Sequence, residues 1–150
     1  MSNGQLRLSS SAFKDGASIP VKYTCKGDNV SPAFRIDGVP EKTLSLALIM
    51  HDPDAPSGDF LHWTVWNINP ATSQITENSL PAGAVQGLTD FGQASYGGPC
   101  PPSGTHHYHF DLYTLDTQLG LKSGATVAEL RQHMQNHILV KTTLIGLFSK

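Results

Sequence analysis

The sequence predicts a mainly antiparallel β domain, sandwich-like and with few helices. Charged residues make up only 15% of the 150-residue chain, and its 14 glycines and 10 prolines are suited to tight turns. Short apolar or alternating segments recur between these turns, which is typical of successive short strands. A single segment carries the pattern of an amphipathic helix. Since the length is that of one domain, residues 1–150 are expected to form one unit with one core.

The N-terminal part is expected to contain short strands. Leu6 and Leu8 alternate with polar neighbours, and Ile19, Val21 and Tyr23 alternate again before the turn-forming residues CKGDN. Alternation with a period of two places one set of side chains on one face of a strand. We therefore expect a strand at each of these two places.

Longer strands are expected in the middle and at the end of the chain. TLSLALIM, residues 43–50, is nearly all apolar and predicts a strand buried on both faces. HWTVWNIN, residues 62–69, is β-branched and aromatic and ends at an Asn-Pro turn signal. After the Gly-rich region 82–98, HHYHFDLYTL predicts a strand over 106–115, and a last strand is expected at about 142–148.

One helix is expected near the C-terminus. Thr126 and Glu129 have the spacing of a capping box, in which each side chain caps the backbone of the other residue. Apolar residues then follow at helical spacing, at Val127, Leu130, Met134 and Ile138. We expect this apolar stripe to pack on the sheet.

Composition narrows the class of protein. The net charge of −2 and the pI near 6.3 give no basic footprint for nucleic acid. The N-terminal MSNGQLRLSSS has no apolar signal region, and no run approaches the roughly 18 apolar residues that span a bilayer. We expect a cytoplasmic protein that is not membrane-integral. Cys25 and Cys100 are then expected as reduced thiols, although spacing leaves a bridge between them open.

The segment HDPDAPSGDFLHW, residues 51–63, has two carboxylates two positions apart. In an extended backbone Asp52 and Asp54 would face one side, next to a chain stiffened by Pro53 and Pro56, whose peptide bonds could be cis or trans. A solvated turn is the simpler interpretation, because Asp and Pro are ordinary turn residues. His62 is equally open, since a lone histidine beside apolar residues is often a structural group.

The segment YGGPCPPSGTHHYHF, residues 96–110, leads from a Gly/Pro loop into histidines. Alternation puts His106 and Tyr108 on one face of a strand and His107 and His109 on the other. The histidines therefore cannot all serve one site. The segment is either one wall of a binding site or a plain turn and strand.

Metal and nucleophile sites are weaker alternatives. The residues with metal-ligand chemistry are Asp52, Asp54, His62 and His106, but they lack the spacing of a recognised zinc motif. His107 and His109 would supply two ligands only, so no metal or other cofactor is expected. Cys100 beside His106 could be a nucleophile and its base, but Cys100 lacks the helix N-terminus that usually activates a thiol.

These two segments together resemble the signature segments of the phosphatidylethanolamine-binding protein family. The bacterial and archaeal branch, also described as Raf kinase inhibitor-like proteins, is the most similar, and it shares segments like YTCKGDNVSP and LIGLFSK. The resemblance covers about residues 13–148. It implies an antiparallel β-sandwich of Greek-key type with one or two short helices, and a small anion pocket at one edge.

The resemblance also implies a set of ligand-binding residues. They are Asp52, Asp54, Pro56, Phe60, His62, Gly98, Pro99, Cys100, His106 and Tyr108. The chain departs from the family pattern at His107, where an arginine is usual, and at Cys100, which is glycine in eukaryotic relatives. It has no counterpart of their C-terminal helix before Lys150, so we expect a more open site and do not carry over eukaryotic kinase regulation.

The function implied is that of a binding protein and not an enzyme. His62 and His106, oriented by carboxylates, would donate to phosphate, a phosphoethanolamine-like head group or another phosphorylated ligand, with help from Tyr108 and the Gly98 backbone. Phe60 would face an amine. Alternatives are an interaction protein that regulates a kinase or inhibits a protease, and a small hydrolase using Asp52, Asp54 and His62. Prokaryotic relatives imply a homodimer.

Overall fold

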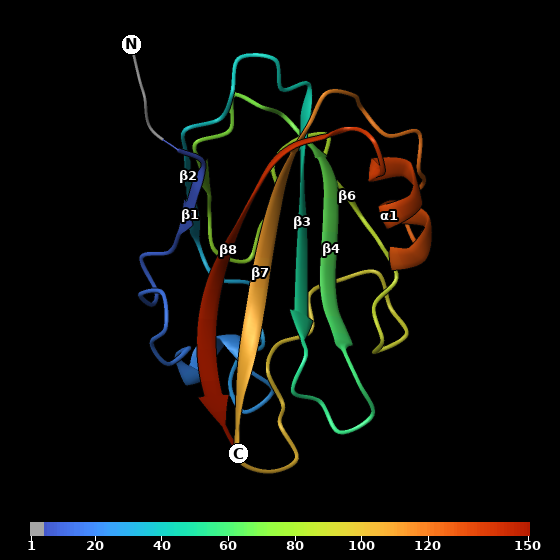
Figure 1. Ribbon diagram of the computed structural model, residues 1–150. Helices are drawn as coiled ribbons and strands as arrows, with labels where there is room; N and C mark the ends of the chain where they lie inside the picture. The colour runs from blue at the N-terminus through green and yellow to red at the C-terminus, as the bar shows by residue number, and fades with distance from the viewer. Residues whose placement is uncertain (1–4) are drawn as a thin grey trace.

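Two antiparallel β-sheets and one α-helix form three layers in a computed structural model that describes residues 5–150 (Figure 1). Residues 1–4, which begin the segment expected to lack a signal region, lie outside the described residues. The smaller sheet has the order β1 (Arg7–Ser9), β2 (Phe34–Asp37), β5 (Gln74–Ile75). The larger sheet has the order β6 (Val85–Gln86), β4 (Phe60–Ile68), β3 (Ser45–Asp52), β7 (Thr105–Leu115), β8 (Ile138–Ser149).

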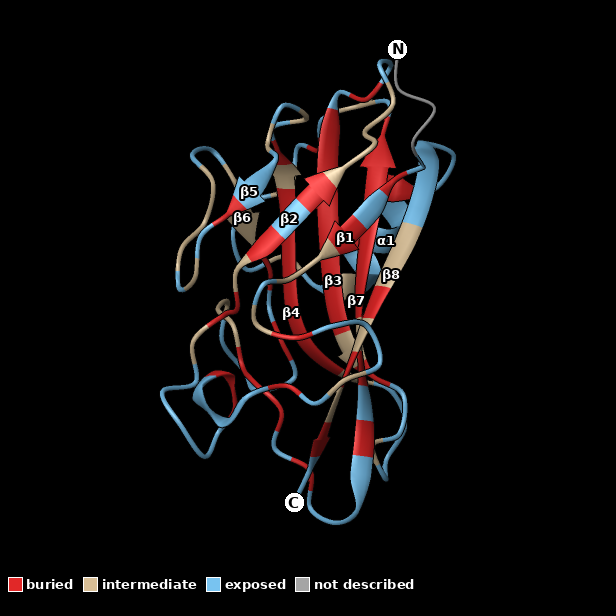
Figure 2. Ribbon diagram, turned by 90° about the vertical axis from the view of Figure 1, so that its left-hand side faces the viewer, coloured by how far each residue is buried: buried red, intermediate tan, exposed pale blue. Residues whose placement is uncertain are grey.

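The central strands β3, β4 and β7 are buried along most of their length (Figure 2). One face of the larger sheet packs on the smaller sheet through residues such as Met50, Trp63 and Phe110. The other face packs under the helix through residues such as Ile49 and Trp66. The apolar run of β3 is therefore buried on both faces, as predicted, because its alternate side chains enter two different cores.

Helix α1 (Val127–Met134) begins with the expected capping box. The Glu129 N–H donates to Thr126 Oγ1 over 3.1 Å, and the Thr126 N–H donates to Glu129 Oε1 over 3.0 Å. Leu130 and Met134 are buried against the outer face of the larger sheet. The predicted stripe is correct up to Met134, but Ile138 lies in β8 and is exposed.

The fold class is confirmed, and several local predictions are corrected. Residues 19–23 were expected to form a strand, but Val21–Tyr23 forms a 3₁₀ turn, η1, after Pro20, and Val21 is exposed. The short strands β2, β5 and β6 were not predicted. The peptide bonds of residues 5–150 are all trans, including those before Pro53 and Pro56. No helix in this part of the chain is long and apolar enough to cross a bilayer.

Candidate functional site

A pocket of about 220 Å³ opens at the end of the sheet where β3 ends and where β4 and β7 begin. Most of the predicted ligand-binding residues line it, namely Asp52, Pro56, Phe60, His62, Cys100, His106 and Tyr108. The β3–β4 hairpin and the loop that enters β7 form its sides, and they approach each other at the lower end of the molecule (Figure 1). A cavity of this size suits a small head group better than a drug-sized ligand.

A buried, hydrogen-bonded pair of residues, Asp52 and His106, lines the pocket. His106 Nδ1 donates to Asp52 Oδ2 over 2.6 Å, and the two residues are only 6% and 3% exposed. Asp52 lies at the end of β3 and His106 near the start of β7. A carboxylate bonded to one ring nitrogen fixes the tautomer of an imidazole. The pair therefore leaves the His106 Nε2 atom to contact a ligand.

His62 is the second buried histidine of the pocket. Its Nδ1 donates to the backbone carbonyl of Gly97 over 2.6 Å, so Nε2 is again the nitrogen left for a ligand. Burial lowers the pKa of His62 below its usual value, against the opposing effect of the Gly97 bond. The neutral ring is favoured at pH 7, and its Nε2 then accepts a hydrogen bond and does not donate one.

Aromatic rings form the walls. The centroid of the Phe60 ring lies 5.1 Å from that of His62 and 4.9 Å from that of Phe91, and the His62 and Phe91 centroids are 5.3 Å apart. The Tyr108 ring meets His62 edge-on, with centroids 5.2 Å apart, and burial raises the Tyr108 pKa. Several aromatic faces around one small space can hold an ammonium group by cation–π attraction.

The loop that enters β7 is fastened to the segment around η1. Gly98 donates its N–H to Asn29 Oδ1 over 2.8 Å, and Cys25 donates its N–H to the Pro99 carbonyl over 3.1 Å. A Cβ at position 98 would lie 2.1 Å from the Tyr23 carbonyl oxygen, so this close approach requires glycine. Cys25 and Cys100 form a disulfide, and the expectation of two reduced thiols is therefore wrong.

Three of the predicted residues do not line the pocket. Asp54 turns to the opposite side, where its Oδ2 accepts from the His107 backbone N–H over 2.8 Å and from the His107 ring over 2.7 Å. The chain turns immediately after β3, where Asp52 Oδ1 accepts a hydrogen bond from the Asp54 N–H over 2.8 Å. Residues two positions apart share a face only within a strand, so Asp54 does not share the face of Asp52. Gly98 and Pro99 are buried behind the wall. The Gly98 N–H already has a partner and is not the anion donor expected.

Sequence reasoning missed several residues of the pocket, namely Ala55, Ser57, Phe91, Pro101 and Pro102. Phe91 is the most consequential, because its ring completes the aromatic wall. A Cβ at Gly97 would lie 2.2 Å from the Phe91 ring, so glycine at this position makes room for the ring. Nothing in the local sequence of Phe91 points to the pocket, whereas the run Pro99–Pro102 beside the histidines was a usable signal for a shaped wall.

The chain matches the family model described as phosphatidylethanolamine-binding protein over residues 9–149. Among curated proteins, a UPF0098 protein of Methanothermobacter thermautotrophicus is 47% identical in an alignment 150 residues long, which covers 97% of this chain and 99% of that protein. A UPF0098 protein of Pyrococcus abyssi is 46% identical and is matched over 94% of this chain and 84% of its own length.

Solved structures agree with the sequence matches. A phosphatidylethanolamine-binding protein homologue from Chlamydia trachomatis superposes with a TM-score of 0.93 and 38% identity, over 97% of this chain and 98% of that chain. E. coli YbcL, described as a new member of the mammalian family, gives a TM-score of 0.91 and 31% identity, over 98% and 99% of the two chains. The chain therefore belongs to the phosphatidylethanolamine-binding protein family.

Proposed function

We propose that the pocket binds small ligands that carry both a phosphate and an amine, with the phosphoethanolamine head group as the simplest example. The observation that carries this proposal is the buried Asp52–His106 pair beside His62, inside a wall of aromatic rings. Both histidines have one nitrogen occupied by the protein and the other left for a ligand. Burying polar groups is unfavourable unless they are hydrogen-bonded, and here hydrogen bonds hold both histidines at the wall of a cavity, which supports a role in binding.

The two charges of the ligand have different partners in the pocket. A phosphate oxygen accepts from the Nε2–H of His62 once that ring is protonated, while His106 lines the same pocket. Such charge-assisted bonds are stronger in an apolar pocket than in water. An ammonium group is attracted to the faces of Phe60 and Phe91 and to the Asp52 carboxylate. Because the His62 pKa is lowered by burial, anion binding is expected to strengthen as pH falls below 6.5, the usual histidine value.

We also propose that the protein binds its ligand without turning it over. Two of its candidate nucleophiles are poorly suited: Cys100 is held in a disulfide, and burial raises the pKa of the Tyr108 hydroxyl. The hydrolase alternative needs Asp52, Asp54 and His62 together, whereas Asp54 bonds to His107 outside the pocket. Release of phosphate from phosphoester substrates by the purified protein would contradict this part of the proposal.

An NMR titration tests the binding proposal. Phosphate, ethanolamine and O-phosphoethanolamine are added separately to ¹⁵N-labelled protein at one pH below and one pH above 6.5, with chemical shifts followed at His62, Tyr108 and Phe91. His106→Gln removes the ring that pairs with Asp52, and His107→Gln is its matched control, because His107 is the adjacent histidine on the other side of the strand.

We expect O-phosphoethanolamine to bind more tightly than either fragment, and more tightly at the lower pH. The His106→Gln variant should lose most of the shifts and the His107→Gln variant should keep them. Equal affinity for the three compounds, or equal losses in the two variants, would contradict the assignment of the pocket.

Three further expectations stay predictions. A kinase or protease partner would use the same pocket, so O-phosphoethanolamine should compete with such a partner for binding to the protein.

A homodimer is expected, and sedimentation of the purified protein tests it. The cytoplasmic location is tested by trapping thiols in intact cells, since the Cys25–Cys100 disulfide belongs more naturally to an oxidising compartment or to a hyperthermophile.

A further inference from the structure

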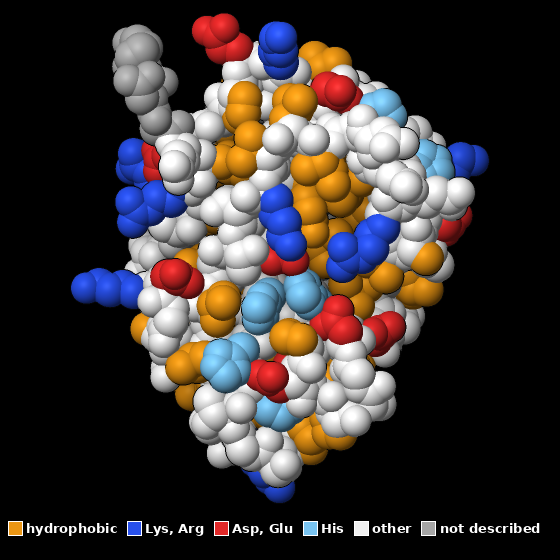
Figure 3. Space-filling model, viewed as in Figure 1, with side chains coloured by type: hydrophobic (Ala, Val, Ile, Leu, Met, Phe, Trp, Pro, Cys, Tyr) orange, Lys and Arg blue, Asp and Glu red, His pale blue; other side chains and the backbone are white. Residues whose placement is uncertain are grey.

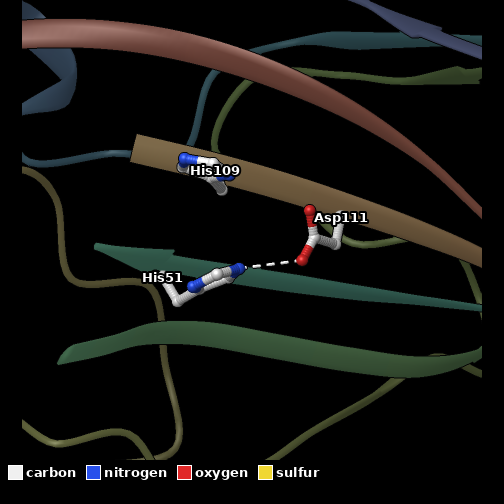
Figure 4. Close-up of side chains that lie close together, drawn as sticks. All are labelled: His51, His109 and Asp111. Carbon is white, nitrogen blue, oxygen red and sulfur yellow. Dashed lines mark hydrogen bonds and ion pairs between the residues drawn. The ribbon is translucent and has the colours of Figure 1, made fainter. Parts of the chain in front are cut away.

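A second cluster of titratable side chains lies on the opposite face of the larger sheet. His51 in β3 and His109 in β7 are cross-strand neighbours, and Asp111 follows two positions along β7 (Figure 4). One ligand atom of each residue lies within 4.8 Å of the others. Histidine side chains gather near the middle of this face, with acidic side chains beside them (Figure 3). The adjacent residue Asp52 serves the pocket, so strand alternation separates the two groups.

Hydrogen bonds already orient two members of the cluster. His51 Nε2 lies 2.8 Å from Asp111 Oδ2, and His51 Nδ1 lies 2.8 Å from Asp59 Oδ1. Thr143 Oγ1 donates to the other Asp111 oxygen over 2.7 Å. The His51 and Asp111 side chains are 14% and 5% exposed. The cluster is therefore ordered and still reachable from solvent at one side.

His109 completes the cluster without a protein partner of its own. Its ring centroid lies 5.3 Å from that of His51, and within residues 5–150 no hydrogen bond engages its ring nitrogens. A free imidazole beside a buried carboxylate and a second imidazole is the donor set that first-row transition metals prefer, with two nitrogens and one oxygen. Calcium and magnesium favour all-oxygen sites and are not suited to it.

We propose that His51, His109 and Asp111 bind one divalent transition-metal ion, for which zinc is the natural probe. Tetrahedral ligands at zinc lie about 3.3 Å apart, so the 4.8 Å cluster needs only side-chain adjustment, and the His51–Asp111 contact opens slightly to admit the ion. The fourth position stays open to water or a ligand.

The surroundings of the cluster match those of metal-bound histidines. Such a histidine usually donates its second ring N–H to a carboxylate, which fixes the ring and strengthens the ligand. For His51 this second carboxylate is Asp59, and the Thr143 hydroxyl donates a hydrogen bond to the Asp111 carboxylate. Asp59 is thus a positioning residue and not a ligand.

Substitution of Lys141 should strengthen metal binding, whereas substitution of a ligand should weaken it. Its Nζ lies 3.7 Å from Asp111 Oδ2, where it balances the charge that a metal ion would balance. The side chain is 51% exposed and can swing away when the ion binds. Removing this competing cation should strengthen metal binding by up to about tenfold, whereas a purely structural cluster would show no such gain.

Metal binding is measured on the untagged full chain with its disulfide intact, by calorimetry with Zn²⁺ and by the visible absorption of Co²⁺. Both cysteines are in the disulfide, so no thiolate contributes to the Co²⁺ spectrum. The variants are His109→Ala, Asp59→Asn and Lys141→Gln. The matched control is His137→Ala, because His137 forms an exposed pair with Asp116 at 2.8 Å but belongs to no three-ligand group among the described residues.

We expect one Zn²⁺ per chain in the unsubstituted protein and in His137→Ala, and no measurable binding in His109→Ala. Asp59→Asn should bind about 10- to 100-fold more weakly, and Lys141→Gln more tightly. Absence of binding in the unsubstituted protein overturns the proposal, as does a loss in His137→Ala. If His109→Ala fails to fold, Lys141→Gln decides, and binding that is unchanged or weaker in that variant overturns the proposal.

Discussion

Removal of the Cys25–Cys100 disulfide should measurably destabilise the protein without dismantling the native fold. Both cysteines are exposed residues, so a double Cys→Ser variant loses little buried area. The hydrogen bond from the Cys25 N–H to the Pro99 carbonyl does not depend on the sulfur atoms and should persist. The perturbation therefore acts mainly on the unfolded chain, which the disulfide would otherwise close into a loop.

The size of the effect follows from the length of that loop. The two cysteines are 75 residues apart in the sequence. For a loop of this length, the chain-entropy relation gives roughly 4.5 kcal/mol of stabilisation. For a chain of this size, each 1 kcal/mol corresponds to about 2–4 °C in the melting temperature, so the variant should melt roughly 9–18 °C lower.

Urea and thermal unfolding of three samples measure the effect: the oxidised protein, the reduced protein and the double Cys→Ser variant. The reduced protein and the variant should agree, and both should show a larger urea m-value, because an unlinked chain exposes more surface on unfolding. A loss of unfolding free energy below about 1 kcal/mol, with thiol counts confirming reduction, would refute the loop-entropy reasoning.

Two more changes test the pocket. As the pH falls from 6.5 toward the lowered pKa of His62, the unfolded state takes up a proton that the folded state does not, so the unfolding free energy should fall by up to about 1.4 kcal/mol per pH unit for this one group. The decline should be shallower in His62→Gln in urea titrations over this range, and identical slopes would contradict the assignment. Gly98→Ala places a Cβ 2.1 Å from the Tyr23 carbonyl oxygen and should cost about 1–3 kcal/mol. Gly120→Ala, where a Cβ meets nothing within 4 Å, should cost much less, and similar losses at both positions would argue against the close approach.

The long strands and the helix start were predictable because each carries a strong local signal. The apolar run of β3 and the alternation of β7 reflect burial that extends over many residues. Strands β2, β5 and β6 have two to four residues, too few for a period to be seen. The helix was extended too far, although Asn136 gave a signal: it has φ 70° directly after the cap and ends the helix as glycine often does.

The pocket was predictable from motif residues but not from strand geometry alone. Asp52 and His106 meet because β3 and β7 are paired neighbours, a long-range fact that no local pattern contains. Asp54 was misplaced because the chain turns as soon as β3 ends. The disulfide and the contribution of Phe91 depend on how distant loops pack, so the sequence offered no means to choose them.

Because side chains alternate along β3 and β7, single substitutions and one-residue insertions or deletions should affect the two sites differently. In β3, His51 faces the cluster that it forms with His109 and Asp111, and Asp52 faces the pocket. In β7, His106 faces the pocket and His109 faces the cluster. A single substitution can therefore alter one site and leave the other intact. A one-residue insertion or deletion within β3 would instead exchange the faces of His51 and Asp52, and both sites would lose their β3 residue at once. The two sites can therefore diverge by point mutation, whereas the register of the strands that they share constrains both sites together.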